Sequence, residues 1–175
     1  MDALRRNLAA GRREAFAELY DTLVEQLYRF LVVRVRSRAD ADDVLQETFA
    51  RLAKNCERFE RVENLTAYVF TVTRNEAARF AARRSRRRDV ETPLEVDAIF
   101  AIAPDDSRRR ETAEMITVGL ASLTDVQREV VELKTYGGLT FVEIAQVTDS
   151  PQGTVATRYR TALGRLRSFI REEES

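Results

Sequence analysis

Apolar residues recur along most of the chain at intervals of three and four, which is the period of an amphipathic α-helix. In the first half this period predicts helices at about 12–36, 40–54 and 65–87, while 55–64 breaks it and is expected to be a loop. The expected buried stripes are Phe16, Leu19, Tyr20, Leu23, Leu27 and Leu31, then Leu45, Phe49 and Leu52, then Tyr68, Val69, Val72, Ala77 and Phe80. Because alternating runs of β-branched residues are lacking, the fold is predicted to be all-α.

The helical pattern fails between 88 and 110, a stretch with two of the three prolines and an acidic, weakly apolar middle. Beyond it, helices are expected at about 111–123, 124–136, 140–147 and 151–172. The chain is therefore predicted to hold two small helical domains, at 1–90 and 111–175, joined by a flexible linker at 91–110.

Short polar residues mark where several of these helices begin. Asp40 is expected to cap the helix at 40–54, with Asp43 in the capping-box position. Thr124 and Gln127 have the spacing of a second capping box. A Gly-Gly pair then predicts the end of the helix that this box begins.

The last two helices are joined by very few residues. Thr140 and Glu143 form a capping box, Asp149 suits a left-handed turn, and Ser150 is expected to cap the final helix with Pro151 at its first position. The apolar face of that helix consists of Val155, Tyr159, Ala162, Leu163 and Leu166. The opposite face consists of Gly153, Thr157, Arg160, Thr161 and Gly164. This pattern predicts a helix-turn-helix whose polar half can enter a major groove, with an ordinary αα-corner as the alternative.

Formal charge cancels at 29 basic against 29 acidic residues, but the bases are almost all arginine, with Lys54 and Lys134 as exceptions. A bias in genomic base composition is one explanation. Arginine also suits bidentate binding to phosphate and to guanine edges. Seven arginines lie between 74 and 88, where Glu76 is the one acid. This stretch is either a nucleic-acid footprint or a solvated helix end.

Several functional classes have little support in the sequence. The chain lacks histidine, Cys56 is its one cysteine, and it has no phosphate-binding glycine loop or nucleophile elbow, so an enzyme is not expected and no cofactor is predicted. No apolar run reaches the ~20 residues of a membrane span, and the start has no signal-peptide core, so membrane insertion is not expected. A lone cysteine fits a reducing interior, which predicts a cytoplasmic protein.

Three stretches resemble the sigma-70 family of RNA polymerase sigma factors, in its extracytoplasmic-function (ECF) group. Residues 122–167, SLTDVQREVVELKTYGGLTFVEIAQVTDSPQGTVATRYRTALGRLR, are similar to region 4 of that family. Residues 39–52, ADADDVLQETFARL, are similar to region 2.2. Residues 67–88, AYVFTVTRNEAARFAARRSRRR, are similar to regions 2.3 and 2.4. These blocks stand in the family's order and cover most of the chain.

The resemblance implies an alternative sigma factor that directs core RNA polymerase to specific promoters. In the family the region 2.2 helix binds the largest polymerase subunit, and the matching residues are Asp40, Asp42, Asp43, Gln46 and Glu47. The N-terminal domain recognises and melts the −10 element, which it holds as single-stranded DNA, and the matching residues are Arg58, Phe59, Arg61, Asn64, Tyr68, Arg74, Asn75, Arg79 and Arg83. The helix-turn-helix binds the −35 element as duplex, and the matching residues are Gln152, Thr154, Ala156, Thr157, Arg158 and Arg160.

Other interpretations stay open at this stage. The acidic face at 40–47 also fits a solvated helix face or a carboxylate metal site, and Tyr68 and Phe70 also fit core positions. A stand-alone helix-turn-helix regulator would share the C-terminal half of the chain, but it leaves the region 2.2 similarity unexplained. Family members are often held inactive by an anti-sigma factor, and no residue here assigns such a partner.

The chain departs from the family pattern at four positions. Ala156 stands where a basic residue is usual, and Asp149 replaces the usual turn glycine. Thr71 stands where a basic residue is common, and Glu76 where an aliphatic one is. These departures bear on the promoter sequence and the affinity for it rather than on the fold.

Overall fold

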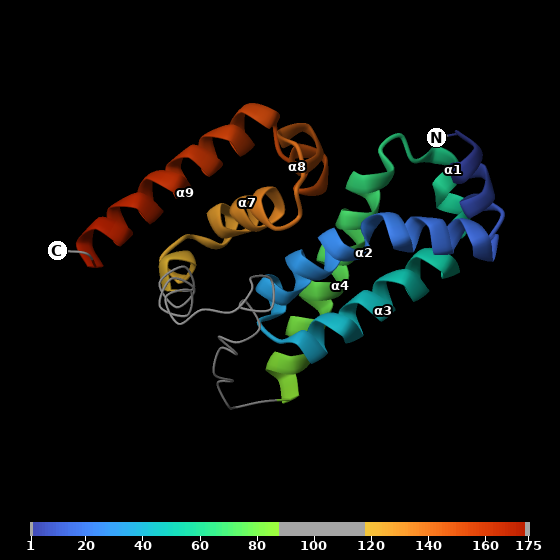
Figure 1. The fold of residues 1–175 in the computed structure, drawn as a ribbon, viewed down its shortest axis with the longest axis horizontal. Coiled ribbons are helices and arrows are strands. Elements are labelled where there is room, and N and C mark those ends of the chain that lie inside the picture. The colour runs from blue at the N-terminus through green and yellow to red at the C-terminus, as the bar shows by residue number, and fades with distance from the viewer. Residues whose placement is uncertain (1, 88–117, 174–175) are drawn as a thin grey trace. The chain divides into compact units, whose positions relative to one another are not determined.

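The computed structural model describes residues 2–87 and 118–173, and every regular element within these ranges is a helix (Figure 1). The chain separates into two compact units, Met1–Thr92 and Pro93–Ser175, called here the N-terminal and C-terminal units. The predicted all-α fold with two small domains is confirmed. Its boundaries at 90, 91, 110 and 111 stay predictions, because these positions lie outside the described residues. The same holds for the linker and for most of the helix expected at 111–123.

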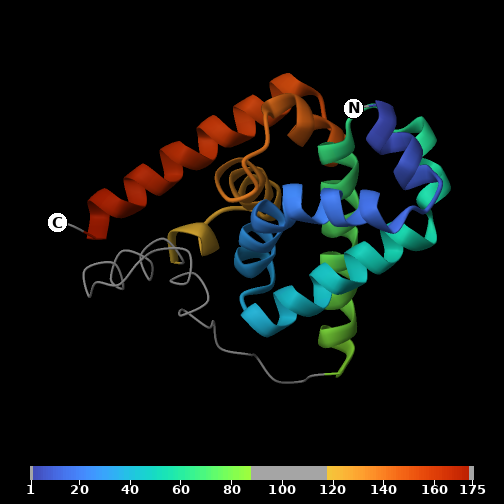
Figure 2. The same ribbon diagram turned by 45° about the vertical axis from the view of Figure 1, so that its right-hand side comes forward.

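The N-terminal unit is a helical bundle in which α2 packs against both α3 and α4, and α3 against α4 (Figure 2). A short first helix packs against α2 and against a 3-10 helix, η1, which occupies the stretch expected to be a loop. The elements are α1 (Asp2–Ala9), α2 (Arg13–Val35), α3 (Arg38–Lys54), η1 (Cys56–Arg61) and α4 (Leu65–Arg87). The three long helices were predicted, whereas α1 and η1 were not.

The core of this unit forms where α2, α3 and α4 meet. Phe30 of α2 and Phe70 of α4 are both fully buried, with ring centroids 5.7 Å apart, so the core alternative for Phe70 is confirmed. Tyr20 departs from its predicted stripe because it is 41% exposed, and it lies against Phe49 of α3 with a centroid distance of 5.0 Å. The aromatic pair therefore marks the edge of the core. None of the helices among the described residues is long and apolar enough to cross a membrane.

The start of α3 differs from the prediction. Ser37, not Asp40, is the N-cap: its Oγ accepts a hydrogen bond from the Asp40 backbone N–H at 3.3 Å. The reason is the short connection, since α2 ends with Arg36 in the left-handed conformation (φ 60°) and leaves one residue before α3 begins. Asp40 instead lies in the first turn, where its negative charge favours the positive end of the helix dipole.

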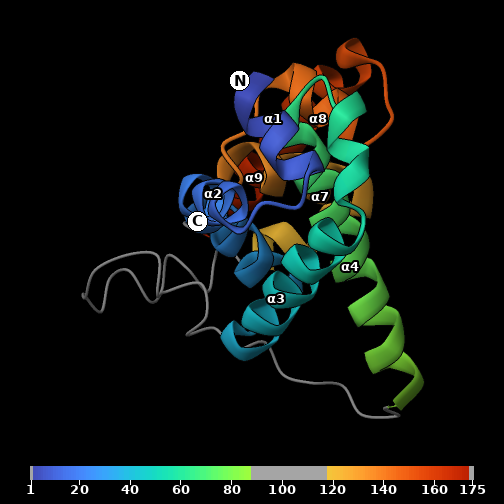
Figure 3. The ribbon, with the colours of Figure 1, turned by 90° about the vertical axis from the view of Figure 1, so that its right-hand side faces the viewer.

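Within residues 118–173 of the C-terminal unit, α7 packs against α8 and α9, and α8 packs against α9 (Figure 3). Their bounds are α7 (Asp125–Thr135), α8 (Phe141–Val147) and α9 (Gln152–Glu173). Both predicted capping boxes are present, at Thr124 and at Thr140. The buried side chains that join the three helices include Val130, Leu133, Ile144, Val155 and Ala162.

The turn between α8 and α9 is tight. Asp149 has φ 47°, so the predicted left-handed position is confirmed. The predicted cap is wrong by one residue, because α9 begins at Gln152 and the Pro151 carbonyl accepts the bond from the Val155 N–H at 3.1 Å. Ser150 turns back instead: its hydroxyl donates to the Thr148 carbonyl at 3.1 Å. Pro151 thus supplies the rigid entry into α9.

Replacing Thr140 with alanine is expected to lower the free energy of unfolding of the C-terminal unit by about 1 kcal/mol. The Thr140 N–H donates to Glu143 Oε2 at 2.8 Å and the Glu143 N–H donates to Thr140 Oγ1 at 3.2 Å, so the change removes half of a reciprocal cap. Urea denaturation followed by circular dichroism measures the loss. Thr161→Ala on the exposed face of α9 is the control, and an equal loss there would contradict the capping role.

Candidate nucleic-acid interface

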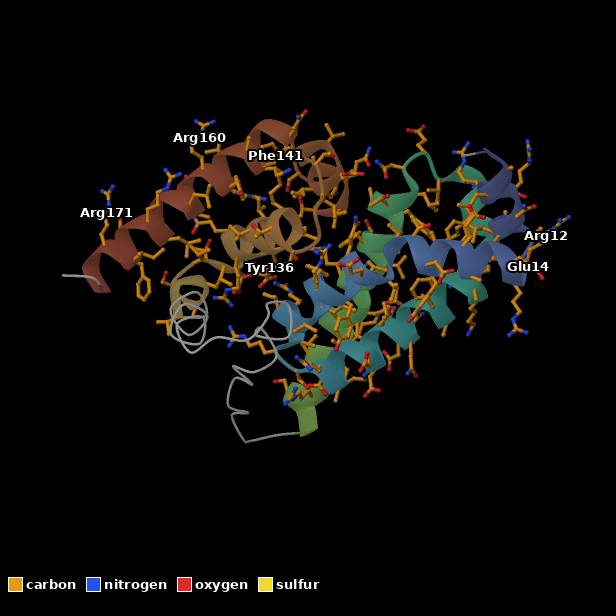
Figure 4. All side chains as sticks on the ribbon, viewed as in Figure 1. Arg12, Glu14, Tyr136, Phe141, Arg160 and Arg171 are labelled. Carbon is orange, nitrogen blue, oxygen red and sulfur yellow. The ribbon has the colours of Figure 1, made fainter. Side chains whose placement is uncertain are left out.

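The outward face of α9 is polar and open. Gly153, Thr157, Arg160, Thr161 and Gly164 are all exposed, as the sequence predicts, while Val155 and Ala162 on the opposite face are fully buried. Figure 4 shows Arg160 projecting from α9 on the side away from α7. The small residues at the start of the helix place little side-chain bulk in front of its backbone. A helix of this kind can approach the floor of a major groove closely.

The predicted −35 residues lie in the first turns of α9, but they are not equally available. Gln152 and Arg160 are exposed, and Thr154 and Ala156 are half-buried. The Thr157 hydroxyl donates to the Gly153 carbonyl at 2.9 Å. Arg158 Nη1 donates to Ser150 Oγ at 3.1 Å. The remaining two, Gln152 and Arg160, therefore extend most directly into solvent.

Aromatic and polar contacts hold α9 against the rest of its unit. The rings of Phe141 and Tyr159 meet edge to face with centroids 5.5 Å apart, and Lys134 Nζ lies 5.2 Å from the Phe141 centroid. Further along α9, Arg165 Nη1 donates to Gln127 Oε1 at 3.0 Å. These contacts join α8 and α7 to α9 at separate points, so the orientation of the polar face within the unit is fixed.

The predicted −10 residues between Arg58 and Tyr68 lie on η1 and at the start of α4. Asn64 caps α4, because its Oδ1 accepts the Ala67 N–H at 2.9 Å. Tyr68 is half-buried; its burial raises the pKa of the phenol, Arg58 lowers it and Glu57 raises it further. The phenol is therefore neutral at pH 7 and can act as a hydrogen-bond donor.

Phe59 does not lie at the surface. It is 0% exposed, and its ring packs edge to face on Phe16 at 5.9 Å and on Tyr68 at 5.4 Å between centroids. A ring with no exposed area cannot stack on a base in this conformation. The prediction that Phe59 contacts DNA is therefore corrected: Phe59 is the support beneath Tyr68. The sequence could not separate the two aromatics, because both lie in or beside a stretch without helical period.

α1 also contributes to this part of the unit. Arg5 Nη1 donates to the Val62 carbonyl in the segment between η1 and α4. Leu8 is fully buried, and α1 packs on η1. The N-terminal helix therefore braces the segment that carries the candidate −10 residues, a role that its eight residues did not reveal in the sequence.

The candidate polymerase residues and the candidate DNA residues meet along the α3–α4 contact. Glu47 Oε2 of α3 accepts from Arg83 Nη2 of α4 at 2.7 Å, and Asp40 Oδ2 forms an ion pair with Arg84. The sequence predicted two separate surfaces and gave no indication that Glu47 and Arg83, one from each, pair across 36 residues, or that Asp40 pairs with Arg84 across 44.

Several other members of the two sets face solvent. Asp42, Asp43 and Gln46 are exposed on α3, and Asn75 and Arg79 are exposed on α4, where Arg74 is half-buried. Asn75, Arg79 and Arg83 follow one another at four-residue spacing, so they share one face of α4. Within residues 2–87 and 118–173, no group of three or more histidine, cysteine or carboxylate side chains could hold a metal ion.

Comparisons with known proteins cover both units. Residues 19–87 match the family Sigma-70 region 2, and residues 119–168 match Sigma-70, region 4. The ECF RNA polymerase sigma factor SigK of Mycobacterium bovis (strain BCG / Pasteur 1173P2) is 30% identical over 180 residues, which is 97% of this chain and 93% of that protein. SigK of Mycolicibacterium vanbaalenii is 26% identical, covering 97% of this chain and 89% of that protein.

Two solved structures share the fold. The first is CnrH in complex with the cytosolic domain of CnrY, with a TM-score of 0.71 and 21% identity over 97% of this chain and 96% of that one. The second is the sigma factor RpoE in complex with the anti-sigma factor NepR from Bartonella quintana, with a TM-score of 0.67 and 21% identity over 89% of this chain and 96% of that one.

Proposed function

The chain belongs to the sigma-70 family, in its ECF group, and is an alternative sigma factor that directs RNA polymerase to specific promoters; we propose that its two units divide promoter recognition between them. The observation that carries the proposal is that each unit has both an exposed polar helix face and a match to a sigma-70 region. A stand-alone regulator is not favoured, because it would need the C-terminal unit alone.

In the C-terminal unit, α9 enters the major groove of the −35 element. Arg160 has the exposure and the bidentate fork that a guanine edge requires, and Gln152 can read an adenine in the same groove. Arg158 keeps the turn between α8 and α9 in place through Ser150. With Ala156 in place of a basic residue, the helix makes one charged contact fewer than its relatives, so the unit binds its element weakly by itself.

In the N-terminal unit, Tyr68 stacks on an unpaired base of the −10 element while Phe59 supports it from below. Arg58 and Arg61 on η1 are exposed beside it and attract the DNA backbone. The Asn64 amide group retains two N–H donors, because its capping bond to Ala67 uses only the oxygen. Stacking and polar contacts of this kind offset the cost of unstacking the base.

Along α4, Arg74, Asn75, Arg79 and Arg83 contact the DNA backbone, which positions the protein without reading sequence. Each domain thus holds part of a promoter, and the connection between them converts two weak contacts into a stronger one through effective concentration. Like sigma factors generally, the protein supplies recognition rather than catalysis, and it needs no cofactor for this role.

Core polymerase binds the exposed side of α3. Asp42, Asp43 and Gln46 carry this contact, because all three are exposed on α3, whereas Asp40 and Glu47 are half-buried. Acidic and amide groups on an exposed helix complement a basic surface on the polymerase. The two structural relatives were solved with protein partners, CnrY and NepR, the latter an anti-sigma factor. We infer that this chain also has an anti-sigma partner.

Changing Asp43 and Gln46 together to alanine is expected to weaken binding to core polymerase by about 2 kcal/mol, which is about thirtyfold. The loss follows because both groups are exposed, and no hydrogen bond or ion pair among residues 2–87 engages either of them. Titration of labelled protein with core polymerase measures it.

The matched control is Asp21→Ala with Gln26→Ala, which makes the same changes on α2. If the control weakened polymerase binding as much as the α3 double variant, α3 would not be the docking face. If wild-type protein failed to bind core polymerase at all, the assignment as a sigma factor would itself be contradicted.

A further inference from the structure

Glu76 is a buried carboxylate in the N-terminal unit, at a position where packing of the bundle does not require a charged group. It lies on α4, facing α3, and is 2% exposed. Its Oε1 accepts a hydrogen bond from Arg79 Nη1 of α4 at 2.5 Å and forms an ion pair with Arg51 of α3, whose Nε lies 3.0 Å away. We call these three residues the Arg51–Glu76–Arg79 triad. Arg51 was not among the residues expected to contact DNA.

Burying a carboxylate is costly, and the attraction of its partners seldom does more than offset that cost. An aliphatic side chain at the same position would fill the space between α3 and α4 without this desolvation. The stability of the bundle therefore does not account for Glu76. What the carboxylate does supply is orientation, because it ties together two long side chains that would otherwise sample many rotamers.

The two arginines meet at one oxygen but remain at the surface. The Arg51 side chain is 46% exposed and that of Arg79 is 53% exposed. A guanidinium has five N–H donors, and the contacts with Glu76 involve one nitrogen of each arginine. Two guanidinium groups that meet the same carboxylate oxygen, with a net charge of +1 for the triad, offer donors suited to an anion with several oxygens, such as a phosphate.

We propose that the Arg51–Glu76–Arg79 triad is a preorganised binding site for a backbone phosphate of DNA, in which Glu76 is the positioning residue. DNA is favoured over a small phosphate compound because Asn75 and Arg83 extend the same face of α4 in both directions, and a row of donors fits a polymer. That the DNA is a promoter rests on the proposed function. The triad adds α3 to a contact that the sequence assigned to α4 alone.

The test is the binding of the full chain to a labelled duplex of random sequence, measured by fluorescence anisotropy over a range of KCl concentrations. Glu76→Leu removes a negative charge, so general electrostatics would strengthen DNA binding. Loss of positioning would instead weaken DNA binding. We expect this effect to dominate and to lower the affinity about fivefold, which is equivalent to one net hydrogen bond. Arg51→Ala is expected to weaken binding as well and to reduce the salt slope by about 0.9, the value for one phosphate contact.

Two further measurements separate positioning from structure. Thermal melting of Glu76→Leu is expected to show stability equal to or above that of the wild type. In a protein in which Arg51 and Arg79 are already alanine, adding Glu76→Leu should weaken DNA binding little further. Arg13→Ala, an exposed arginine on α2, is the charge-matched control for Arg51→Ala.

Tighter DNA binding by Glu76→Leu, or equal slopes for Arg13→Ala and Arg51→Ala, would overturn the proposal. Because the duplex is random, this outcome is independent of whether the protein binds polymerase. If Glu76→Leu fails to fold, the Arg51→Ala and Arg13→Ala pair still decides. If the wild-type protein failed to bind polymerase while Glu76→Leu weakened DNA binding, the triad proposal would stand and the sigma role would be contradicted.

Discussion

Replacing Phe59 with alanine is expected to lower the free energy of unfolding of the N-terminal unit by about 3–5 kcal/mol, the cost of truncating a large aromatic in a packed core. Phe59 has no exposed surface and packs on two other rings, those of Phe16 and Tyr68. The cavity would lie directly beneath the proposed base-stacking residue. The variant is therefore expected to lose promoter melting as well as stability.

Urea denaturation followed by circular dichroism measures this change, and the Thr140→Ala variant identifies which transition belongs to the C-terminal unit. Phe49→Ala is the matched control, because this ring is on α3 of the same unit but only half-buried, and a smaller loss is expected. A loss for Phe59→Ala of less than about 1 kcal/mol, with melting activity lost all the same, would restore Phe59 as a direct DNA contact.

Replacing Arg160 with alanine is expected to remove about 1–3 kcal/mol of discrimination at one base pair of the −35 element. Arg160 is exposed on α9 and projects away from the helices that hold it (Figure 4). Arg160→Lys should recover only part of the effect, since a lysine cannot bind a guanine edge with the same planar fork. Holoenzyme binding to promoters with every single-base change in the −35 element measures the discrimination.

Arg167→Ala is the control for this prediction. Arg167 is exposed two turns further along the same face of α9, beyond the half that enters the groove. Its loss should weaken binding to all sequences equally or not at all. If Arg160→Ala also lowered affinity equally for every sequence, Arg160 would be a phosphate contact rather than a base contact.

Much of the fold was predictable because the long helices carry their own apolar period and their own caps. The capping boxes at Thr124 and Thr140 and the left-handed turn at Asp149 depend on residues a few positions apart, and the structure confirms all three. The start of α3 was misplaced because the connection from α2 is too short for the expected loop, so Ser37 took the cap. α1 was missed because its eight residues lack a capping box such as the one that marks the seven-residue α8.

The candidate site was less predictable, because its arrangement depends on contacts between distant parts of the chain. The ion pairs of Asp40 and Glu47 with arginines of α4 cross from one helix to another. Arg51 lies in a helix whose assigned surface is acidic, and the buried Glu76 links it to the face of α4 that we propose contacts DNA. Likewise, nothing local to η1 distinguishes the buried ring of Phe59 from the half-buried ring of Tyr68.

The most direct test of the central claim is run-off transcription with purified bacterial core polymerase, with and without this protein, on a pool of fragments from the source genome. We expect discrete new transcripts that require the protein and disappear when Asp43 and Gln46 are both alanine. The sigma role would be contradicted if no transcript depended on the protein while the protein alone bound a duplex site specifically and tightly.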